Sequence, residues 1–81
     1  MDEIRIKADK RVDLGGNIKD LRTAKGMTQA EMLRSLELLG SGLYREIYRR
    51  IEKNQRNVSA SELLDIKEVL GASFEELFRR E

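Results

Sequence analysis

Basic side chains recur at helical spacing in the middle of the chain, where they are well placed to bind another molecule. Arg or Lys stands at positions 45, 49, 50 and 53, and apolar residues stand at 47, 48 and 51. In a helix this spacing gives one apolar face and one cationic face. Such a helix is typical of proteins that read DNA, and a run of charge is also the ordinary solvated face of a surface helix. The pattern therefore indicates a DNA-reading helix, with the solvated face as the open alternative.

The residue types that are missing limit the chemistry of the chain. Its 81 residues include no Cys and no His. Their absence removes disulfides, thiolate nucleophiles, the usual general base and the usual transition-metal ligands. No spacing suggests a converging pair of carboxylates either. We therefore expect no enzymatic activity, no catalytic residues, no metal site and no small-molecule cofactor.

The sequence also bears on where the protein works. No apolar run approaches the ~20 residues that span a membrane. The charged N-terminal stretch MDEIRIKADKR has no signal-peptide core. We expect a cytoplasmic protein without a membrane partner, associated with the nucleoid when it is bound to DNA.

Charge is unevenly distributed along the chain, although the net charge is only +1. Residues 17–58 hold nine Lys or Arg against five Asp or Glu, a net charge of +4. Residues 59–81 hold three against six, a net charge of −3. This segregation favours a middle segment that faces a polyanion and an acidic end that faces away from it.

Helix caps and apolar spacing predict an all-α fold, a compact bundle of five helices. Asp13 can cap a first helix that ends near Gly26. Thr28 and Glu31 form a T-x-x-E capping box that begins a second helix, which runs to about Leu39. The residues expected to face the core from these two helices are Leu14, Ile18, Leu21, Met32, Leu33 and Leu36.

The third helix is expected at about residues 44–54, and its sequence leaves more than one beginning open. Tyr44 is a poor cap, so the helix could begin early, at Ser41 or Gly42. Its end is expected near Asn54, which adopts the left-handed conformation more readily than most residues. A loop, QRNV, follows it.

Two further capping boxes begin the last helices, Ser59 with Glu62 and Ser73 with Glu76. The side chains expected to face inward from them are Leu63, Leu64, Ile66, Val69, Leu70, Phe74, Leu77 and Phe78. At the other end of the chain, EIRIK alternates apolar and charged residues. That segment could be a short strand, an ordered arm or a disordered leader.

This ordered set of segments resembles the phage repressor/Cro (Xre-type) helix-turn-helix family over residues 14–78. The landmarks are LGGNIKDLRTAKGMTQAEM, RRIEKNQRNV and SASELLDIKEVLGASFEELF. The segment SLELLGSGLY is longer than in common members and resembles a subgroup with a longer turn before the recognition helix. The resemblance implies an N-terminal arm at 1–11 and a helix-turn-helix DNA-binding domain at 12–81.

The resemblance also assigns roles to single residues. Base-edge positions correspond to Arg45, Glu46 and Arg50, with Arg49 beside them; Arg can pair with guanine and Glu can accept a hydrogen bond from cytosine. Arg22 and Glu52 correspond to a buried, purely structural ion pair. Tyr48 and Ile51 anchor the third helix. The expected phosphate-contacting residues are Thr28, Gln29, Lys53, Asn54, Gln55, Arg56 and Asn57.

The function expected from this resemblance is sequence-specific binding of double-stranded DNA by a transcriptional repressor that acts by occupying its operator. Proteins of this type bind as twofold dimers, so we expect a homodimer on DNA, with the last helix as a candidate dimer surface. The alternative is an antitoxin-like or other protein-interaction module that uses the same fold.

Overall fold

Capping side chains decide where most helices of this protein begin. The computed structural model describes residues 5, 6, 9 and 11–80. Asp13 caps α1, and complete capping boxes begin α2, α4 and α5 at Thr28, Ser59 and Ser73. All four starts agree with the sequence prediction. The helices are α1 (Leu14–Ala24), α2 (Gln29–Leu38), α3 (Arg45–Glu52), α4 (Ala60–Leu70) and α5 (Phe74–Leu77).

The third helix begins at Arg45, at the start of the predicted range and not at the earlier alternative. Its N-cap is Tyr44, which makes no side-chain capping hydrogen bond, so an early start at Ser41 or Gly42 is wrong. Its end agrees with the prediction, because Asn54 adopts a left-handed backbone conformation with φ of 58°. The result is a short helix of 8 residues. Helices of this length depend on tertiary packing for stability.

Two segments far apart in the sequence form a small antiparallel sheet. Strand β1 (Arg5–Ile6) pairs with β2 (Val58–Ser59), with Arg5 opposite Ser59 and Ile6 opposite Val58. Of the alternatives for the N-terminal segment, the short strand is therefore right for Arg5 and Ile6. The loop expected after α3 is correspondingly wrong at its last residue, because Val58 is in β2.

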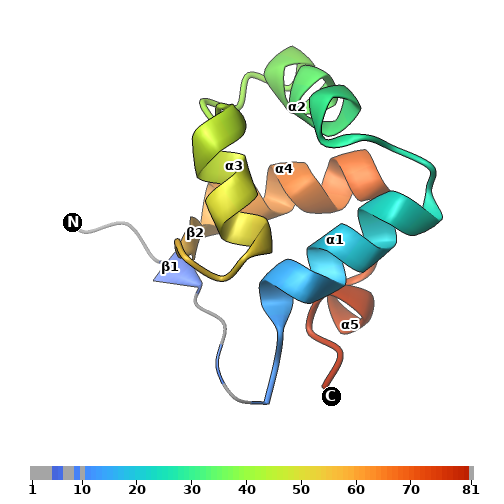
Figure 1. Ribbon diagram of the computed structural model, residues 1–81, viewed down its shortest axis with the longest axis vertical. Coiled ribbons are helices and arrows are strands. Elements are labelled where there is room, and N and C mark those ends of the chain that lie inside the picture. Colours follow the sequence, from blue (N-terminus) through green and yellow to red (C-terminus); the bar gives the residue numbers. More distant parts are fainter. Residues whose placement is uncertain (1–4, 7–8, 10, 81) are drawn as a thin grey trace.

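The helices pack around one core (Figure 1). The segments α2 and α3 contact each other, and α1 contacts both α3 and α5. The helix α4 supports this group through contacts with α2. No helix among the described residues is long and apolar enough to cross a membrane. The buried apolar residues are Leu14, Ile18, Met32, Leu36, Leu43, Tyr48, Ile51, Val58, Leu63, Ile66, Leu70, Ala72 and Leu77.

Two residues that were expected to face inward lie on the surface instead. Leu64 is 54% exposed and Phe74 is 49% exposed. The reason is helical geometry, because Leu63, Ile66 and Leu70 already occupy the buried stripe of α4 and residues on the opposite stripe face solvent. Leu77 alone of the α5 residues is buried. Leu21, Leu33, Val69 and Phe78 are only partly buried against the core.

Close contact between the start of α1 and the end of α3 requires a glycine. A Cβ on Gly15 would overlap the carbonyl oxygen of Ile51 and would lie 2.7 Å from the carbonyl oxygen of Glu52. Asn54 closes the same junction: its Oδ1 accepts a hydrogen bond from Gly15 N at 2.8 Å, and its Nδ2 donates to Asp13 Oδ1. Gly15 thus lets α3 approach the first turn of α1.

Replacing Gly15 by Ala should therefore destabilise the domain. Ala favours a helix over Gly by about 1 kcal/mol, but the obstacle is backbone, so we expect a net loss of about 1–3 kcal/mol in the free energy of unfolding. Gly42→Ala is the matched control, because a Cβ there meets nothing within 4 Å. Urea denaturation measures both. Equal stability of the two variants would show that the junction adjusts without cost.

Candidate nucleic-acid interface

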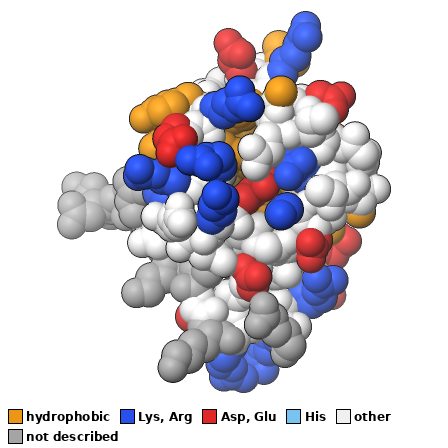
Figure 2. All heavy atoms as spheres, in the orientation of Figure 1, with side chains coloured by type: hydrophobic (Ala, Val, Ile, Leu, Met, Phe, Trp, Pro, Cys, Tyr) orange, Lys and Arg blue, Asp and Glu red, His pale blue; other side chains and the backbone are white. Residues whose placement is uncertain are grey.

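The helix α3 has one buried face and one charged face. Tyr48 is fully buried and Ile51 is 2% exposed. The side chains of Arg45, Glu46, Arg49, Arg50 and Lys53 are exposed. In Figure 2, Lys and Arg side chains gather over α3 with acidic side chains among them. The four residues predicted to read bases thus share one accessible surface, which we call the α3 surface.

One carboxylate lies among the cations of the α3 surface. Glu46 Oε1 and Oε2 each accept a hydrogen bond from Arg49 Nη2 at 3.2 Å. Oε1 also lies 3.5 Å from Arg50 Nε. The pKa of Glu46 lies below its ordinary value, chiefly because of the hydrogen bond from Arg49. In the free protein, Arg49 and Arg50 are therefore both paired with Glu46, a third candidate for base reading.

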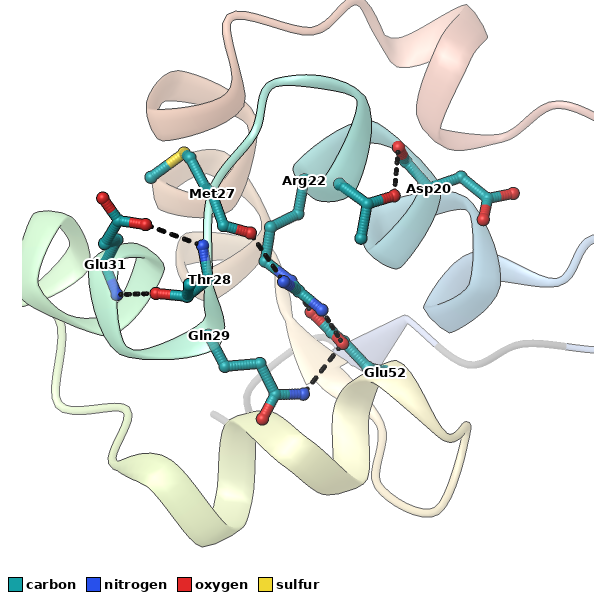
Figure 3. A network of polar contacts seen from close by, with 8 residues as sticks. Asp20, Arg22, Met27, Thr28, Gln29, Glu31 and Glu52 are labelled. Atoms are coloured by element: carbon teal, nitrogen blue, oxygen red, sulfur yellow. Dashed lines mark hydrogen bonds and ion pairs between the residues drawn. The ribbon is translucent and has the colours of Figure 1, made fainter.

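A buried ion pair holds α3 against α1. Arg22 Nε donates to Glu52 Oε2 at 2.7 Å, and Arg22 Nη2 donates to Glu52 Oε1 at 3.1 Å. The two side chains are only 8% and 3% exposed. Figure 3 shows the guanidinium between this carboxylate and the carbonyl oxygen of Met27, to which Nη1 donates at 2.7 Å. The pair implied by the family resemblance is thus present in the structure.

The second helix reaches the same carboxylate. Gln29 Nε2 donates to Glu52 Oε1 at 3.0 Å (Figure 3). Burial by itself would raise the pKa of Glu52, but hydrogen bonds from Arg22 and Gln29 outweigh it, so the pKa lies below its ordinary value. The Tyr48 hydroxyl is also buried and has no hydrogen-bond partner among the described residues. Burial raises the pKa of Tyr48, which keeps this hydroxyl uncharged beside the ion pair.

The residues predicted to contact phosphate divide into two groups. Lys53, Gln55 and Asn57 are exposed after α3, and Thr28 is exposed at the start of α2, where its hydroxyl accepts from Glu31 N. The other three have internal partners: Gln29 donates to Glu52, Asn54 joins Asp13 to Gly15, and Arg56 Nη1 lies 2.9 Å from Glu62 Oε1. These three side chains are thus less free than their sequence positions suggested.

The long turn before α3 adds features that sequence reasoning missed. Leu43 is buried and anchors the turn, whereas Tyr44 is 63% exposed beside Arg45. An open groove of about 700 Å³ lies between α2 and this turn, with Arg34 and Arg45 among its lining residues. The apolar Leu43 between two glycines and an aromatic residue was the available signal for this anchor.

Comparison with known proteins decides the family. No protein-family model matches the chain, and no curated protein matches it. A high-resolution crystal structure does match, that of the restriction-modification controller protein C.AhdI from Aeromonas hydrophila. The two chains are 37% identical with a TM-score of 0.65, over 83% of this chain and 94% of that chain. This chain belongs to the phage repressor/Cro-type helix-turn-helix family.

Membership of this family explains why the site has this form. The protein is a DNA-binding transcriptional regulator with an all-α helix-turn-helix fold. In helix-turn-helix proteins the second helix of the motif enters the major groove and its first residues contact base edges. Here that helix is α3, which has its charged side chains outward and its buried face tied to α1 and α2.

The buried ion pair should contribute strongly to folding when only one partner is removed. Glu52→Ala leaves the Arg22 guanidinium buried without its carboxylate, and we expect a loss of about 3–5 kcal/mol in the free energy of unfolding. Glu46→Ala, which breaks only exposed ion pairs, should cost at most about 1 kcal/mol. Thermal denaturation followed by circular dichroism compares the two. If Glu52→Ala melts like Glu46→Ala, the buried pair contributes no more than a surface pair.

Proposed function

We propose that this protein is a transcriptional repressor that acts by occupying an operator in double-stranded DNA. The observation that carries the proposal is the exposed, cationic α3 surface on a helix whose opposite face is fixed by a buried ion pair. A rigid helix that presents Arg side chains can place their guanidinium groups at the guanine O6 and N7 atoms in the major groove. Binding of this kind needs no chemical step.

The accessible side chains suggest how the contacts are divided. Arg45, Glu46, Arg49 and Arg50 would meet base edges, because they occupy the outward face of α3. Thr28, Lys53, Gln55 and Asn57 would meet phosphates at the two ends of the motif, which sets register rather than sequence preference. Gln29, Asn54 and Arg56 would act mainly by bracing these elements through their internal partners.

A second copy of the chain would complete the operator. A single domain reads one half-site, and dimers of this family read two half-sites about one helical turn apart. An apolar patch suited to a twofold interface lies on α4 and α5. Leu64 and Phe74 are half exposed, Lys67 Nζ lies 4.9 Å from the centre of the Phe74 ring, and the Phe74 and Phe78 rings are 6.3 Å apart. We call these four residues the α4–α5 patch.

The similarity to C.AhdI suggests which genes are regulated. That protein is described as a restriction-modification controller, and identity of 37% over most of both chains supports a comparable role here. The corresponding test is DNase I footprinting of the promoters beside the gene for this protein. Protection upstream of a restriction or modification gene would support the assignment, and protection only elsewhere would contradict it.

Variants of α3 test DNA reading without disturbing the fold. Arg45→Ala and Arg50→Ala should change stability by no more than about 0.5 kcal/mol, but each lost base contact should weaken operator binding by about 1–3 kcal/mol. Lys53→Ala should weaken binding to operator and random DNA alike and lower the salt slope by about 1. Fluorescence titrations on an operator selected from random DNA measure all three.

The control for this experiment removes an Arg far from α3. Arg80 is exposed in the segment after α5, and the C-terminal end of the chain lies away from α3 in Figure 1, so Arg80→Ala should bind DNA as the wild type does. If the folded Arg45→Ala and Arg50→Ala variants also bind like the wild type, α3 does not read DNA. A salt slope near zero for the wild type would favour the protein-interaction alternative, an antitoxin-like module.

The α4–α5 patch predicts a self-association that can be removed by mutation. Phe74→Ser and Leu64→Ser each replace a half-exposed apolar side chain, so the monomer should stay folded while dimerisation weakens at least about tenfold. Leu38→Ser is the matched control, because Leu38 is 82% exposed on α2, outside the patch. Sedimentation equilibrium measures the association constants. Unchanged association in both patch variants would place the interface elsewhere.

A further inference from the structure

The single exposed carboxylate of α3 lies where a DNA-binding surface would normally avoid negative charge. Four basic residues, Arg45, Arg49, Arg50 and Lys53, are exposed on this segment, whereas Glu52 is buried with Arg22. Glu46 therefore contributes the one negative side chain of the α3 surface. It contacts two of the four cations, Arg49 at 3.2 Å and Arg50 at 3.5 Å.

Stability of the fold does not explain this carboxylate. The side chains of Glu46, Arg49 and Arg50 are 51%, 47% and 53% exposed, and ion pairs between exposed side chains contribute little. The helix dipole favours Glu46 in the first turn of α3. A neutral capping side chain in place of Tyr44 would also have stabilised the start of the helix. The placement of Glu46 matters more for what the α3 surface contacts.

The carboxylate acts in opposite ways toward phosphates and toward bases. The carboxylate repels a nearby phosphate, because both are negatively charged. It also neutralises the charge of the arginines that would otherwise bind phosphate. Beside a cytosine it can accept a hydrogen bond from N4, while an adjacent Arg pairs with guanine O6 and N7. Glu46 therefore disfavours binding that involves the DNA backbone alone. It is accommodated where a G·C pair places its cytosine N4 beside the carboxylate.

The geometry points to Glu46 as a specificity-determining residue that acts chiefly against non-operator DNA. This inference rests on the proposed function and deepens it. In the free protein, Glu46 pairs with Arg49 and Arg50. On random DNA it would keep both as its partners. On the operator, an Arg instead pairs with guanine, and the carboxylate of Glu46 accepts a hydrogen bond from cytosine. The residue thus lowers affinity for DNA in general more than affinity for the operator.

The conservative variant Glu46→Gln tests this directly, because glutamine keeps the shape and one acceptor oxygen but removes the charge. Affinity for random duplex DNA should rise about 3–10-fold, with a salt slope steeper by about 0.9 for each phosphate gained. Affinity for the selected operator should rise less than affinity for random DNA, because the hydrogen bond from cytosine N4 loses its charged acceptor. The ratio of operator to random affinity should therefore fall. Fluorescence anisotropy titrations at several salt concentrations measure each quantity, with melting temperatures as the check of folding.

Glu68→Gln is the charge-matched control, since Glu68 is exposed on α4 and the substitution changes the net charge equally. It should leave the ratio of operator to random affinity unchanged. A ratio for Glu46→Gln within twofold of the wild type would overturn the inference. So would a ratio that falls only because operator binding weakens, because Glu46 would then be an ordinary base reader. Failure of the wild type to select any operator would instead overturn the proposed function.

Discussion

The buried contact between Arg22 and Glu52 is the interaction on which the rest of the site depends. It joins α1 to α3, and the hydrogen bond from Gln29 to the same carboxylate adds α2, so the carboxylate of Glu52 connects α1 with both helices of the motif. A buried pair is not in itself a strong source of stability, since both ions lose their hydration. Its directional hydrogen bonds fix one arrangement of the helices. That arrangement decides which side of α3 faces solvent.

The polar tertiary contacts described for α3 and the turn after it lie near the C-terminal end of the helix. Glu52 meets Arg22 there, Gly15 allows the helix backbone to approach α1, and Asn54 ties the following turn to Asp13. The other end begins at Tyr44 without a side-chain cap and is anchored by the buried Leu43. The candidate reading residues Arg45 and Glu46 lie at this second end. The firm attachment at one end thus leaves the other available for contact with a partner.

Features set by neighbouring residues were predictable from the sequence, and features set by distant ones were not. The boxes at Thr28, Ser59 and Ser73 need only residues three positions apart, and all three are present. The pairing of Val58 with Ile6 depends on a segment about fifty residues earlier, so no local pattern could show it. Arg22 and Glu52 are 30 residues apart, and the family resemblance, not a local pattern joining the two, indicated their contact.

The same distinction explains the errors around the candidate site. Leu64 and Phe74 were expected to face inward, but Leu64 lies off the buried stripe of α4 and Leu77 takes the buried position of α5. Arg56 was expected to be free to contact phosphate, but it pairs with Glu62. The sequence had assigned Glu62 to capping α4 and gave no sign of a second partner. One carboxylate performs both tasks: Glu62 Oε1 accepts from Ser59 N and from Arg56 at 2.9 Å each.

The charge distribution suggests why recognition would need a second copy. With a net charge of +1, the protein as a whole attracts DNA only weakly, because long-range steering depends on net charge and its arrangement. The α3 surface is short and one of its charges is negative, so a single domain has few phosphates to neutralise. Two linked domains add their contacts to one duplex, and the second binding event becomes intramolecular. The α4–α5 patch would supply that link mainly through its apolar side chains rather than through attraction to phosphate. Affinity would then depend on two correctly spaced half-sites rather than on general attraction to the phosphate backbone.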